Sequence, residues 1–256
     1  MRIALFSDLH LEFNKSLVLN APDCDLIVLA GDVGPVQVAL EFAQRLAHQE
    51  QVPVIYVPGN HEYYGQDLEQ LNQYLKEWKD PAGLVQVLLE RAVTIGGIRF
   101  VGTTLWTDFK LRGEEAAAMA IEAAEKFLPD FKLIKRGTEV LRATDVVELH
   151  QQARQFLEEA LAKPVPTVVI SHFAPHADCC APQFIESPIT PCFITDCQDL
   201  IERFQPLCWL FGHTHHSVDF QVGTTRIVAN QHGYPHEVGR TSGYSGTHRI
   251  LLDAVV

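Results

Sequence analysis

The 256-residue chain is poor in basic residues, and its apolar runs are all short. It has 20 Lys and Arg against 32 Asp and Glu, which gives a net charge of −12. General nucleic-acid binding and docking to an anionic membrane both need clustered basic side chains, so this balance argues against both. A membrane-spanning helix needs about eighteen or more consecutive apolar residues. We therefore expect no membrane association and no general nucleic-acid binding.

The sequence also lacks CxxC pairs, although it has six cysteines: Cys24, Cys179, Cys180, Cys192, Cys197 and Cys208. In a chain of otherwise ordinary composition, cysteines that lack CxxC spacing favour a reducing compartment. The adjacent Cys179 and Cys180 are expected to be inert thiols. The N-terminal apolar run meets Asp8 too early for a signal peptide. We therefore expect a cytoplasmic protein.

Hydrophobic residues make up 47% of the chain, which excludes disorder as its main state. The apolar runs are nearly continuous rather than alternating, as expected for strands that are covered on both faces. Two adjacent glycines, Gly96 and Gly97, predict a hairpin turn within 93–100. The runs that we predict as strands are Ile3–Ser7, Leu26–Ala30, Val54–Val57, Arg99–Gly102, Thr167–Ser171, Leu207–Phe211, Arg226–Ala229 and Arg249–Asp253.

Helical periodicity separates these strands, with apolar stripes in 38–46 and 68–78 and longer helices predicted at Glu114–Phe127 and Asp145–Leu161. The alternation predicts a single α/β domain over 1–256 with layered sheets. Residues 103–142 form a possible inserted helical cap. Its part 110–142 carries a charge of +1, against the acidic remainder. A cap that guides an anionic substrate and a solvated amphipathic helix pair both fit this segment.

Five predicted strands are each followed, within about two positions, by a residue that can bind metal. The sequences after the strands are Asp8-Leu9-His10, Gly31-Asp32, Gly59-Asn60-His61-Glu62, Ser171-His172 and Gly212-His213-Thr214-His215. In open α/β sheets, ligands bind beyond the carboxyl ends of the strands. We therefore expect the five loops to meet at one site, with the glycines allowing close backbone approach.

The combined donors outnumber the ligands that one ion usually takes. They are Asp8, His10, Asp32, Asn60, His172, His213 and His215. Imidazole and oxygen donors without thiolate suit Mn, Fe, Zn, Co or Ni better than Ca or Mg. Two such ions that share a bridging carboxylate can hold a phosphoryl group and lower the pKa of a bridging water, so that a hydroxide attacks phosphorus. The sequence thus predicts two divalent ions, with Mn the first choice.

The ordered series D-x-H, G-D, G-N-H-E, H and G-H-x-H resembles the calcineurin-like metallophosphoesterase superfamily, and its motifs span residues 8 to 215. The resemblance implies a four-layer α/β/β/α sandwich of two mixed sheets flanked by helices. It also implies a dinuclear phosphoesterase that acts on a small phosphorylated substrate.

The resemblance further implies a role for each residue. Asp8, His10 and His215 would bind one metal, and Asn60, His172 and His213 the other, with Asp32 bridging. Asn60 would also help to hold the phosphoryl oxygens. His61 would stabilise or protonate the leaving oxygen, and Glu62 would orient His61. Family members often carry Asn-Pro-Arg-Gly before a tyrosine, whereas this chain has His232 in place of the arginine, just before Gly233-Tyr234.

Two other functions stay open: a phosphodiesterase that acts on cyclic nucleotides, nucleotide diphosphates or nucleic acid, and an inactive scaffold. The scaffold is disfavoured because all the predicted ligands and His61 are present. Oligomeric state has no sequence signal. The role of five further residues stays open. His216 is expected to face solvent, and Tyr63 and Tyr64 either line the entrance or fill the core. His176 and Asp178 are possible substrate contacts.

Overall fold

Two β-sheets form the centre of the computed structural model, which describes residues 1–21, 23–237 and 243–252. The first sheet has the strand order β13-β1-β2-β3-β4. The second has the order β11-β12-β10-β9-β6-β5. The strands of the first sheet are β1 (Arg2–Phe6), β2 (Leu26–Ala30), β3 (Val54–Val57), β4 (Val85–Val87) and β13 (Ile250–Leu251). Those of the second are β5 (Arg91–Ile95), β6 (Ile98–Thr103), β9 (Thr167–Ser171), β10 (Cys208–Phe211), β11 (Val218–Val222) and β12 (Thr225–Ala229).

Both sheets are mixed, because each adds antiparallel pairs to a parallel centre. The neighbours β1, β2, β3 and β4 are parallel, and β13 pairs with β1 in the antiparallel sense. In the second sheet β6, β9, β10 and β12 are parallel neighbours, while β5 and β11 are antiparallel edge strands. The parallel centres place the carboxyl ends of β1, β2, β3, β9 and β10 where metal-binding loops can meet.

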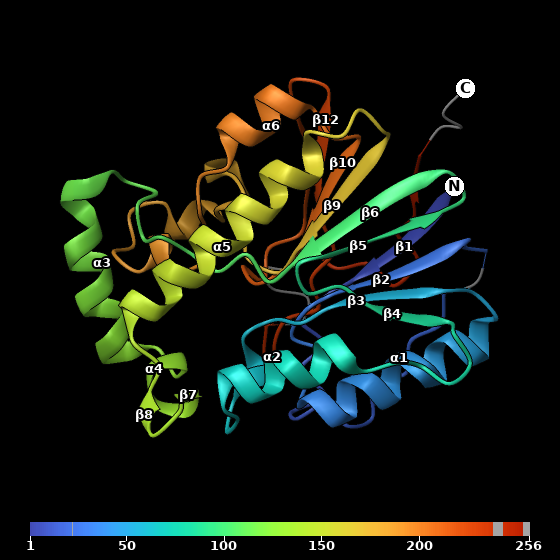
Figure 1. Ribbon diagram of the computed structural model, residues 1–256, viewed down its shortest axis with the longest axis horizontal. Coiled ribbons are helices and arrows are strands. Elements are labelled where there is room, and N and C mark those ends of the chain that lie inside the picture. The colour runs from blue at the N-terminus through green and yellow to red at the C-terminus, as the bar shows by residue number, and fades with distance from the viewer. Residues whose placement is uncertain (22, 238–242, 253–256) are drawn as a thin grey trace.

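Helices cover the outer face of each sheet (Figure 1). The helices α1 (Val36–Glu50) and α2 (Leu68–Glu77) lie beneath the β1–β4 sheet, and α5 (Ala143–Leu161) and α6 (Gln198–Phe204) lie above the other. Short 3-10 turns lie in the connecting loops: η1 (His61–Tyr63), η2 (Ala177–Cys179), η3 (Pro182–Phe184) and η4 (Thr190–Cys192). The order helix, sheet, sheet, helix is the predicted four-layer sandwich.

Alternate residues of each strand belong to different parts of the core, which explains the continuous apolar runs. In β1, Ile3 and Leu5 face the core between the sheets, together with Phe100 and Leu210 of the second sheet. The intervening Ala4 and Phe6 belong to the core that packs against helices. A strand with apolar partners on both faces has no polar face, so its sequence does not alternate.

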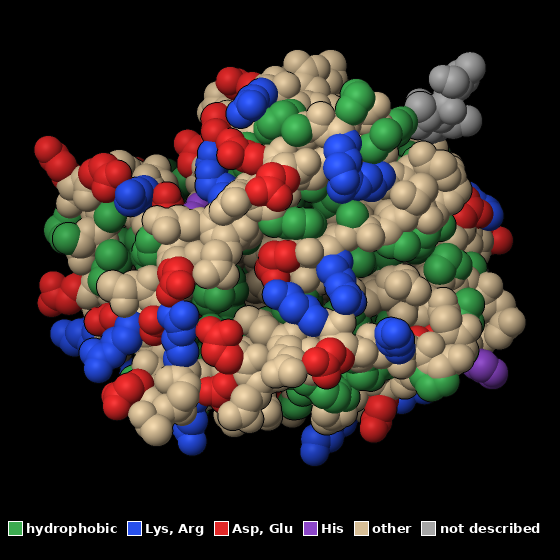
Figure 2. Space-filling model, in the orientation of Figure 1, with side chains coloured by type: hydrophobic (Ala, Val, Ile, Leu, Met, Phe, Trp, Pro, Cys, Tyr) green, Lys and Arg blue, Asp and Glu red, His purple; other side chains and the backbone are tan. Residues whose placement is uncertain are grey.

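The remaining elements form one end of the molecule, at the left of Figure 1. They are α3 (Glu114–Phe127), α4 (Asp130–Leu133) and a small hairpin of β7 (Lys135–Arg136) and β8 (Glu139–Val140). Over the face drawn in Figure 2, basic side chains are interspersed with acidic ones rather than aligned in a basic stripe. Among the described residues, no helix is long and apolar enough to cross a membrane.

Most predicted elements are confirmed, and β2, β3, β9 and α3 have the predicted bounds. The hairpin around Gly96 and Gly97 is confirmed, with both glycines at positive φ. The predicted strand Arg249–Asp253 is shorter, because β13 covers Ile250–Leu251; Asp253 lies outside the described residues.

Candidate metal centre

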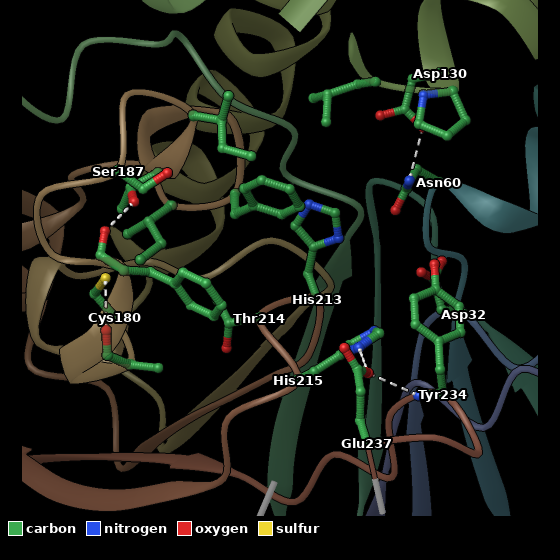
Figure 3. A pocket seen from close by; sticks show the side chains of 18 of the residues that line it. Asp32, Asn60, Asp130, Cys180, Ser187, His213, Thr214, His215, Tyr234 and Glu237 are labelled. Carbon is green, nitrogen blue, oxygen red and sulfur yellow. Dashed lines mark hydrogen bonds and ion pairs between the residues drawn. The ribbon is translucent and has the colours of Figure 1, made fainter. Parts of the chain in front are cut away.

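The five predicted loops meet at one buried site, which forms one side of the cavity in Figure 3. Asp8 and His10 follow β1, Asp32 follows β2, and Asn60 follows β3. His172 follows β9 of the second sheet, and His213 and His215 follow β10. The structure therefore brings together every residue that the sequence predicted as a ligand, from loops of both sheets.

Most of these side chains form two adjoining groups, and a third group of His10, Asp32 and His61 connects them. In the first group, Asp8 Oδ1 lies 3.5 Å from His215 Nε2, and His10 Nε2 lies 3.0 Å from the same nitrogen. In the second group, His172 Nε2 lies 3.3 Å from Asp32 Oδ1, and His213 lies close by. A carboxylate oxygen of Asp32 also lies within 4.8 Å of a ring nitrogen of His10. Asp32 therefore lies between the two groups.

Three histidines are oriented through the ring nitrogen that faces away from the site. His172 Nδ1 donates to the Ala30 carbonyl at 2.9 Å, and His215 Nδ1 contacts Glu237 Oε2 at 2.6 Å. His10 Nδ1 contacts Glu12 Oε1 at 3.2 Å. An acceptor on Nδ1 fixes the proton there, so Nε2 keeps its lone pair for a cation. This arrangement is typical of metal-ligating histidines.

Asn60 is oriented by a carboxylate from the 103–142 segment. Its Nδ2 donates to Asp130 Oδ1 at 2.8 Å, which turns its Oδ1 toward the site, 3.1 Å from His172 Nε2. Asp130 lies 70 positions from Asn60 in the chain, at the start of α4. The amide oxygen thus faces the second group as a ligand would.

Two glycines are required because metal-site side chains occupy the space of a Cβ atom. At Gly59, a Cβ would overlap Asp32 Oδ1 and lie 2.8 Å from His172 Cε1. At Gly212, it would lie 2.8 Å from Asp8 Oδ2. The predicted close backbone approach at these positions is confirmed, and it packs the two sheets' loops directly against one another.

Five of the predicted ligands have a left-handed backbone: Asp8, His10, Asp32, His213 and His215, with φ between 45° and 74°. This conformation is uncommon for non-glycine residues and costs of order 1 kcal/mol or more at each position. Such strain persists where the surrounding structure imposes it. Here it aims donors from neighbouring positions into one volume.

His61 lies beside the two groups, and its orientation differs from the prediction. Its Nδ1 lies 2.9 Å from Glu12 Oε1, and its Nε2 lies 3.9 Å from Asp32 Oδ2. The Glu62 carboxylate instead accepts hydrogen bonds from the backbone amides of Asp32, Val33 and Gly59, at 3.1, 2.9 and 2.7 Å. The prediction that Glu62 orients His61 is therefore wrong. Glu12 makes that contact, while Glu62 joins the loops after β2 and β3.

The ionisable groups have strongly shifted pKa values. Burial lowers the pKa of His61, but Asp32 and Glu12 outweigh this effect and raise it to about 9. Burial opposes ionisation of Glu12, yet hydrogen bonds with His10 and His61 lower its pKa to about 2. Burial and the neighbouring His172 ring lower the pKa of His213, which keeps the imidazole neutral. A charged His61 beside an ionised Glu12 is suited to donating a proton, and a neutral His213 is suited to binding metal.

The site opens into a cavity of about 460 Å³ (Figure 3). Asp32, Asn60, His61, His213 and His215 lie on one side of it. Its other walls come from the 103–142 segment, through Leu128, Pro129 and Asp130, and from the 180–194 loop, through Phe184, Ile189, Phe193 and Ile194. Among the described residues that line this cavity there is no Lys or Arg. The wall opposite the metal site is therefore mainly apolar.

The residues whose role the sequence left open lie in different parts of the structure. Tyr64 lines the cavity, whereas Tyr63 is in the core, where its hydroxyl donates to Asn72 at 2.7 Å. His176 accepts a hydrogen bond from the Asp178 backbone amide, and neither residue is among the described lining residues. His216 is partly exposed and belongs to none of the ligand groups found in the described residues.

The adjacent cysteines are both free. Burial raises the pKa of both thiols, and Cys179 is the more deeply buried of the two. Protonated thiols are poor nucleophiles and poor metal ligands, which agrees with the prediction that they are inert.

From the sequence, no role in the site was predicted for Glu12, Asp130, Tyr234 or Glu237. Glu12 is two positions after His10, so its nearness to a motif was an available signal. Asp130 and Glu237 lie in segments without a motif, and only the tertiary fold brings them to Asn60 and His215. The donor set, with oriented Nε2 and Oδ1 atoms and a shared carboxylate, fits two divalent transition-metal ions.

The comparisons with known proteins agree with this geometry. The family model for calcineurin-like phosphoesterases matches residues 1–217, so the chain belongs to the calcineurin-like phosphoesterase family. The chain is 27% identical to protein L509 of Acanthamoeba polyphaga mimivirus, over 99% of each sequence. It is also 27% identical to the [acyl-carrier-protein] phosphodiesterase PptH of Mycobacterium tuberculosis, over 93% of this chain and 78% of that protein.

A solved structure has the same fold. The crystal structure of phosphopantetheinyl hydrolase PptH from Mycobacterium tuberculosis matches with a TM-score of 0.75 and 22% sequence identity, over 98% of this chain and 96% of that one. Family membership and the fold identify the chain as a metal-dependent phosphoester hydrolase.

Proposed function

We propose that this protein is a dinuclear phosphodiesterase, with Mn as the preferred metal, that cleaves a diester bearing one slender and mostly uncharged arm. The chain is proposed to be a single cytoplasmic domain, in which residues 103–142 form a cap. The contribution of Leu128 and Asp130 to the cavity wall supports the cap, and the free cysteines agree with a reducing compartment.

The observation that carries this proposal is the shape and lining of the cavity. A phosphomonoester has one organic substituent, whereas a diester needs room for a second one beyond the phosphorus. The 460 Å³ cavity continues from the metal site to an apolar wall, which gives that room. Apolar walls favour an uncharged arm, because a charged group would lose its hydration there without a partner.

The chain's own residues have distinct roles in this reaction. Asp8, His10 and His215 would hold one ion, Asn60, His172 and His213 would hold the other, and Asp32 would serve both. When bound, two such ions would neutralise phosphoryl oxygens and lower the pKa of a water.

The histidine outside the ligand set acts on the leaving group. Glu12 accepts the N–H at Nδ1 of His61, and the pKa raised to about 9 keeps the ring charged, so Nε2 also carries a proton, which the leaving oxygen would receive. Asn60, whose amide nitrogen is bonded to Asp130, keeps its oxygen directed to the site.

The relatives suggest a candidate for the arm. The protein named [acyl-carrier-protein] phosphodiesterase PptH is similar along 93% of this chain, and a phosphopantetheinyl arm is long, narrow and without charge beyond its phosphate. Such an arm fits a cavity with mainly apolar walls better than a nucleic acid would. The chain's net charge of −12 also disfavours a nucleic-acid substrate.

A substrate screen tests this function. The Mn-loaded protein is offered bis-p-nitrophenyl phosphate, p-nitrophenyl phosphate, a cyclic nucleotide and a phosphopantetheinylated carrier protein, with chelated protein as the control. We expect the diester to be cleaved faster than the monoester, and the carrier protein to lose its arm by mass spectrometry. Hydrolysis of the monoester alone would overturn the diester assignment.

A further inference from the structure

Tyr234 lies in the metal site and directly follows the segment in which this chain departs from the family pattern. The segment before it pairs with the end of β1: the His232 amide donates to the Ser7 carbonyl and the Gly233 amide to the Asp8 carbonyl, both at 3.0 Å. The Tyr234 ring then stacks on the His10 imidazole, with centroids 4.3 Å apart and an interplanar angle of 28°. The ring position is therefore fixed by the same strand end that carries the ligands.

The hydroxyl of Tyr234 points to His61, the histidine that we propose to act on the leaving group. It lies 3.2 Å from His61 Nε2, and Tyr234 is among the residues that line the cavity. On the other side of the ring, His61 Nδ1 is held by Glu12 at 2.9 Å. Glu12, His61 and Tyr234 thus form a chain of contacts that ends with a phenolic O–H beside Nε2, at the edge of the cavity.

His232 does not take part in this site. The side chain is buried, with Nδ1 2.9 Å from the Gly233 carbonyl and the ring against Tyr244 at a centroid distance of 5.0 Å. It is not among the described residues that line the cavity. The position at which this chain departs from the family motif therefore supplies no phosphate contact, while Tyr234, two positions later, presents a donor there.

We propose that Tyr234 is a catalytic residue whose hydroxyl donates a hydrogen bond to the leaving oxygen beside His61, and that Glu12 is the positioning residue for His61. This inference rests on the proposed phosphoesterase function.

In the step, the oxygen of one water bonds to phosphorus, and the proton that this water gives up passes to solvent, from which His61 is reprotonated afterwards. The bond from phosphorus to the leaving oxygen breaks with its electron pair on that oxygen, which takes a proton from His61 Nε2. Tyr234 keeps its own proton throughout. Its hydrogen bond stabilises the charge that develops before the proton arrives.

The proposal predicts a leaving-group effect in Tyr234→Phe. This variant keeps the ring that stacks on His10 and removes only the hydroxyl, so metal content is expected to be unchanged. We expect kcat to fall about 30-fold for an alkyl diester, such as a phosphopantetheinyl-serine peptide. This is below the loss of about 10²–10³ in rate that removal of one such hydrogen-bond donor causes at most. For bis-p-nitrophenyl phosphate, whose leaving group needs little stabilisation, we expect a loss below about threefold. Glu12→Gln should show the same pattern, and Glu12→Asp a partial recovery.

A binding measurement makes the test independent of turnover. Titration calorimetry of the Mn-loaded protein with inorganic phosphate should show about tenfold weaker affinity in Tyr234→Phe, as expected for one hydrogen bond to a charged group. Tyr63→Phe is the matched control, because its hydroxyl contacts Asn72 in the core. It is expected to leave both readouts unchanged.

The outcomes separate this proposal from the function on which it rests. Equal losses on both diesters, or an unchanged phosphate affinity, would overturn the role of Tyr234 and leave the phosphodiesterase assignment intact. If wild-type protein binds phosphate more tightly than Tyr234→Phe but cleaves no ester, the phosphodiesterase assignment is overturned and the contact of Tyr234 with phosphate is retained.

Discussion

At the scale of single residues, the site depends on contacts behind the atoms that face the metals. Ala30, Glu12 and Glu237 each contact the Nδ1 atom of a histidine that is predicted to bind metal, and Asp130 accepts a hydrogen bond from the Asn60 amide. These partners fix the tautomer of each imidazole and the direction of the amide. Such contacts make the difference between a cluster of donors and a preorganised site.

The bridging carboxylate and the neighbouring histidine should respond differently to substitution. Asp32→Asn removes the negative charge that lies between the two ligand groups, so metal content and activity should fall together. His61→Ala removes no ligand in this scheme, and both ions should stay bound. Its activity should fall by about 10²–10⁴ on alkyl esters and much less on p-nitrophenyl esters.

Metal analysis of each variant, run beside the two kinetic assays, separates these effects. Loss of a metal ion from His61→Ala, or equal slowing on both substrates, would place His61 among the ligands or the substrate-positioning groups.

A histidine far from the metal site gives a prediction for stability against pH. His150 in α5 is buried, and burial lowers its pKa below the ordinary value of 6.5, although Asp108 and the Leu105 carbonyl partly oppose this. The folded state therefore holds a neutral ring, and the unfolded state binds more protons as pH falls below about 6.5. The contribution of His150 should therefore lower stability from pH 7 to pH 5, by at most about 1.4 kcal/mol per pH unit.

Denaturant unfolding of His150→Gln at several pH values measures this contribution. The variant should be less sensitive to acid than the wild type over that range. The same slope in both proteins would mean that His150 keeps an ordinary pKa when folded.

At the scale of single residues, the sequence predicted which side chains converge, because each one directly follows a strand in a short motif. It failed for the partner of His61, because both Glu12 and Glu62 stand two or fewer positions from a motif histidine, and only the backbone path decides which carboxylate reaches the ring. Asp130 and Glu237 had no local signal, since chain folding alone places them.

At the scale of elements, the loops after the strands do more than connect. They leave their strands through left-handed residues and through glycines that lie against ligand side chains. Long, fully buried strands were readily predicted because both faces are apolar. The strands β4 and β11 and the helix α6 were not predicted: β4 has three residues, α6 has seven, and β11 is a partly exposed edge strand. Short elements depend on tertiary contacts more than on local sequence.

A methyl group at Gly59 tests the packing of these loops. In Gly59→Ala, the Cβ would overlap Asp32 Oδ1 and crowd His172, so the loops after β2, β3 and β9 must separate. We expect metal affinity to fall at least tenfold and stability to fall by about 1–3 kcal/mol, as in other overpacked sites. Gly246→Ala is the control, because its Cβ would meet only Tyr244 Oη, at 3.7 Å.

Calorimetric metal titration and thermal unfolding of the two variants provide the measurement. Wild-type metal affinity in Gly59→Ala would show that the loops can separate at no cost, contrary to the structure.

At the scale of the whole molecule, both sheets and the 103–142 segment are needed for one functional cavity. The sheets supply the ligands at their carboxyl ends, and the cavity wall comes from residues 128–130 and 180–194. The layered architecture was predictable from the alternation of strands and helices. The cavity was not, because its wall is formed by loops whose positions depend on packing between distant segments.

A bulky substitution in the wall tests whether the cavity selects the substrate arm. Ile189→Trp should fill part of the space opposite the metals and lower kcat/KM for a phosphopantetheinylated substrate about tenfold or more. The smaller bis-p-nitrophenyl phosphate should be affected less than about threefold. Ile185→Trp is the matched control, because Ile185 is exposed and is not among the described lining residues. Equal effects of the two variants would exclude the wall as a selectivity element.

The central claim is that the seven converging side chains hold two metal ions, and metal analysis tests it most directly. The protein is chelated, loaded with Mn, desalted and analysed for metal per chain, beside Asp32→Asn treated in the same way. We predict close to two ions per chain in the wild type and a clear loss in the variant. A wild-type value at or below about half an ion per chain, unchanged at higher Mn, would contradict the account.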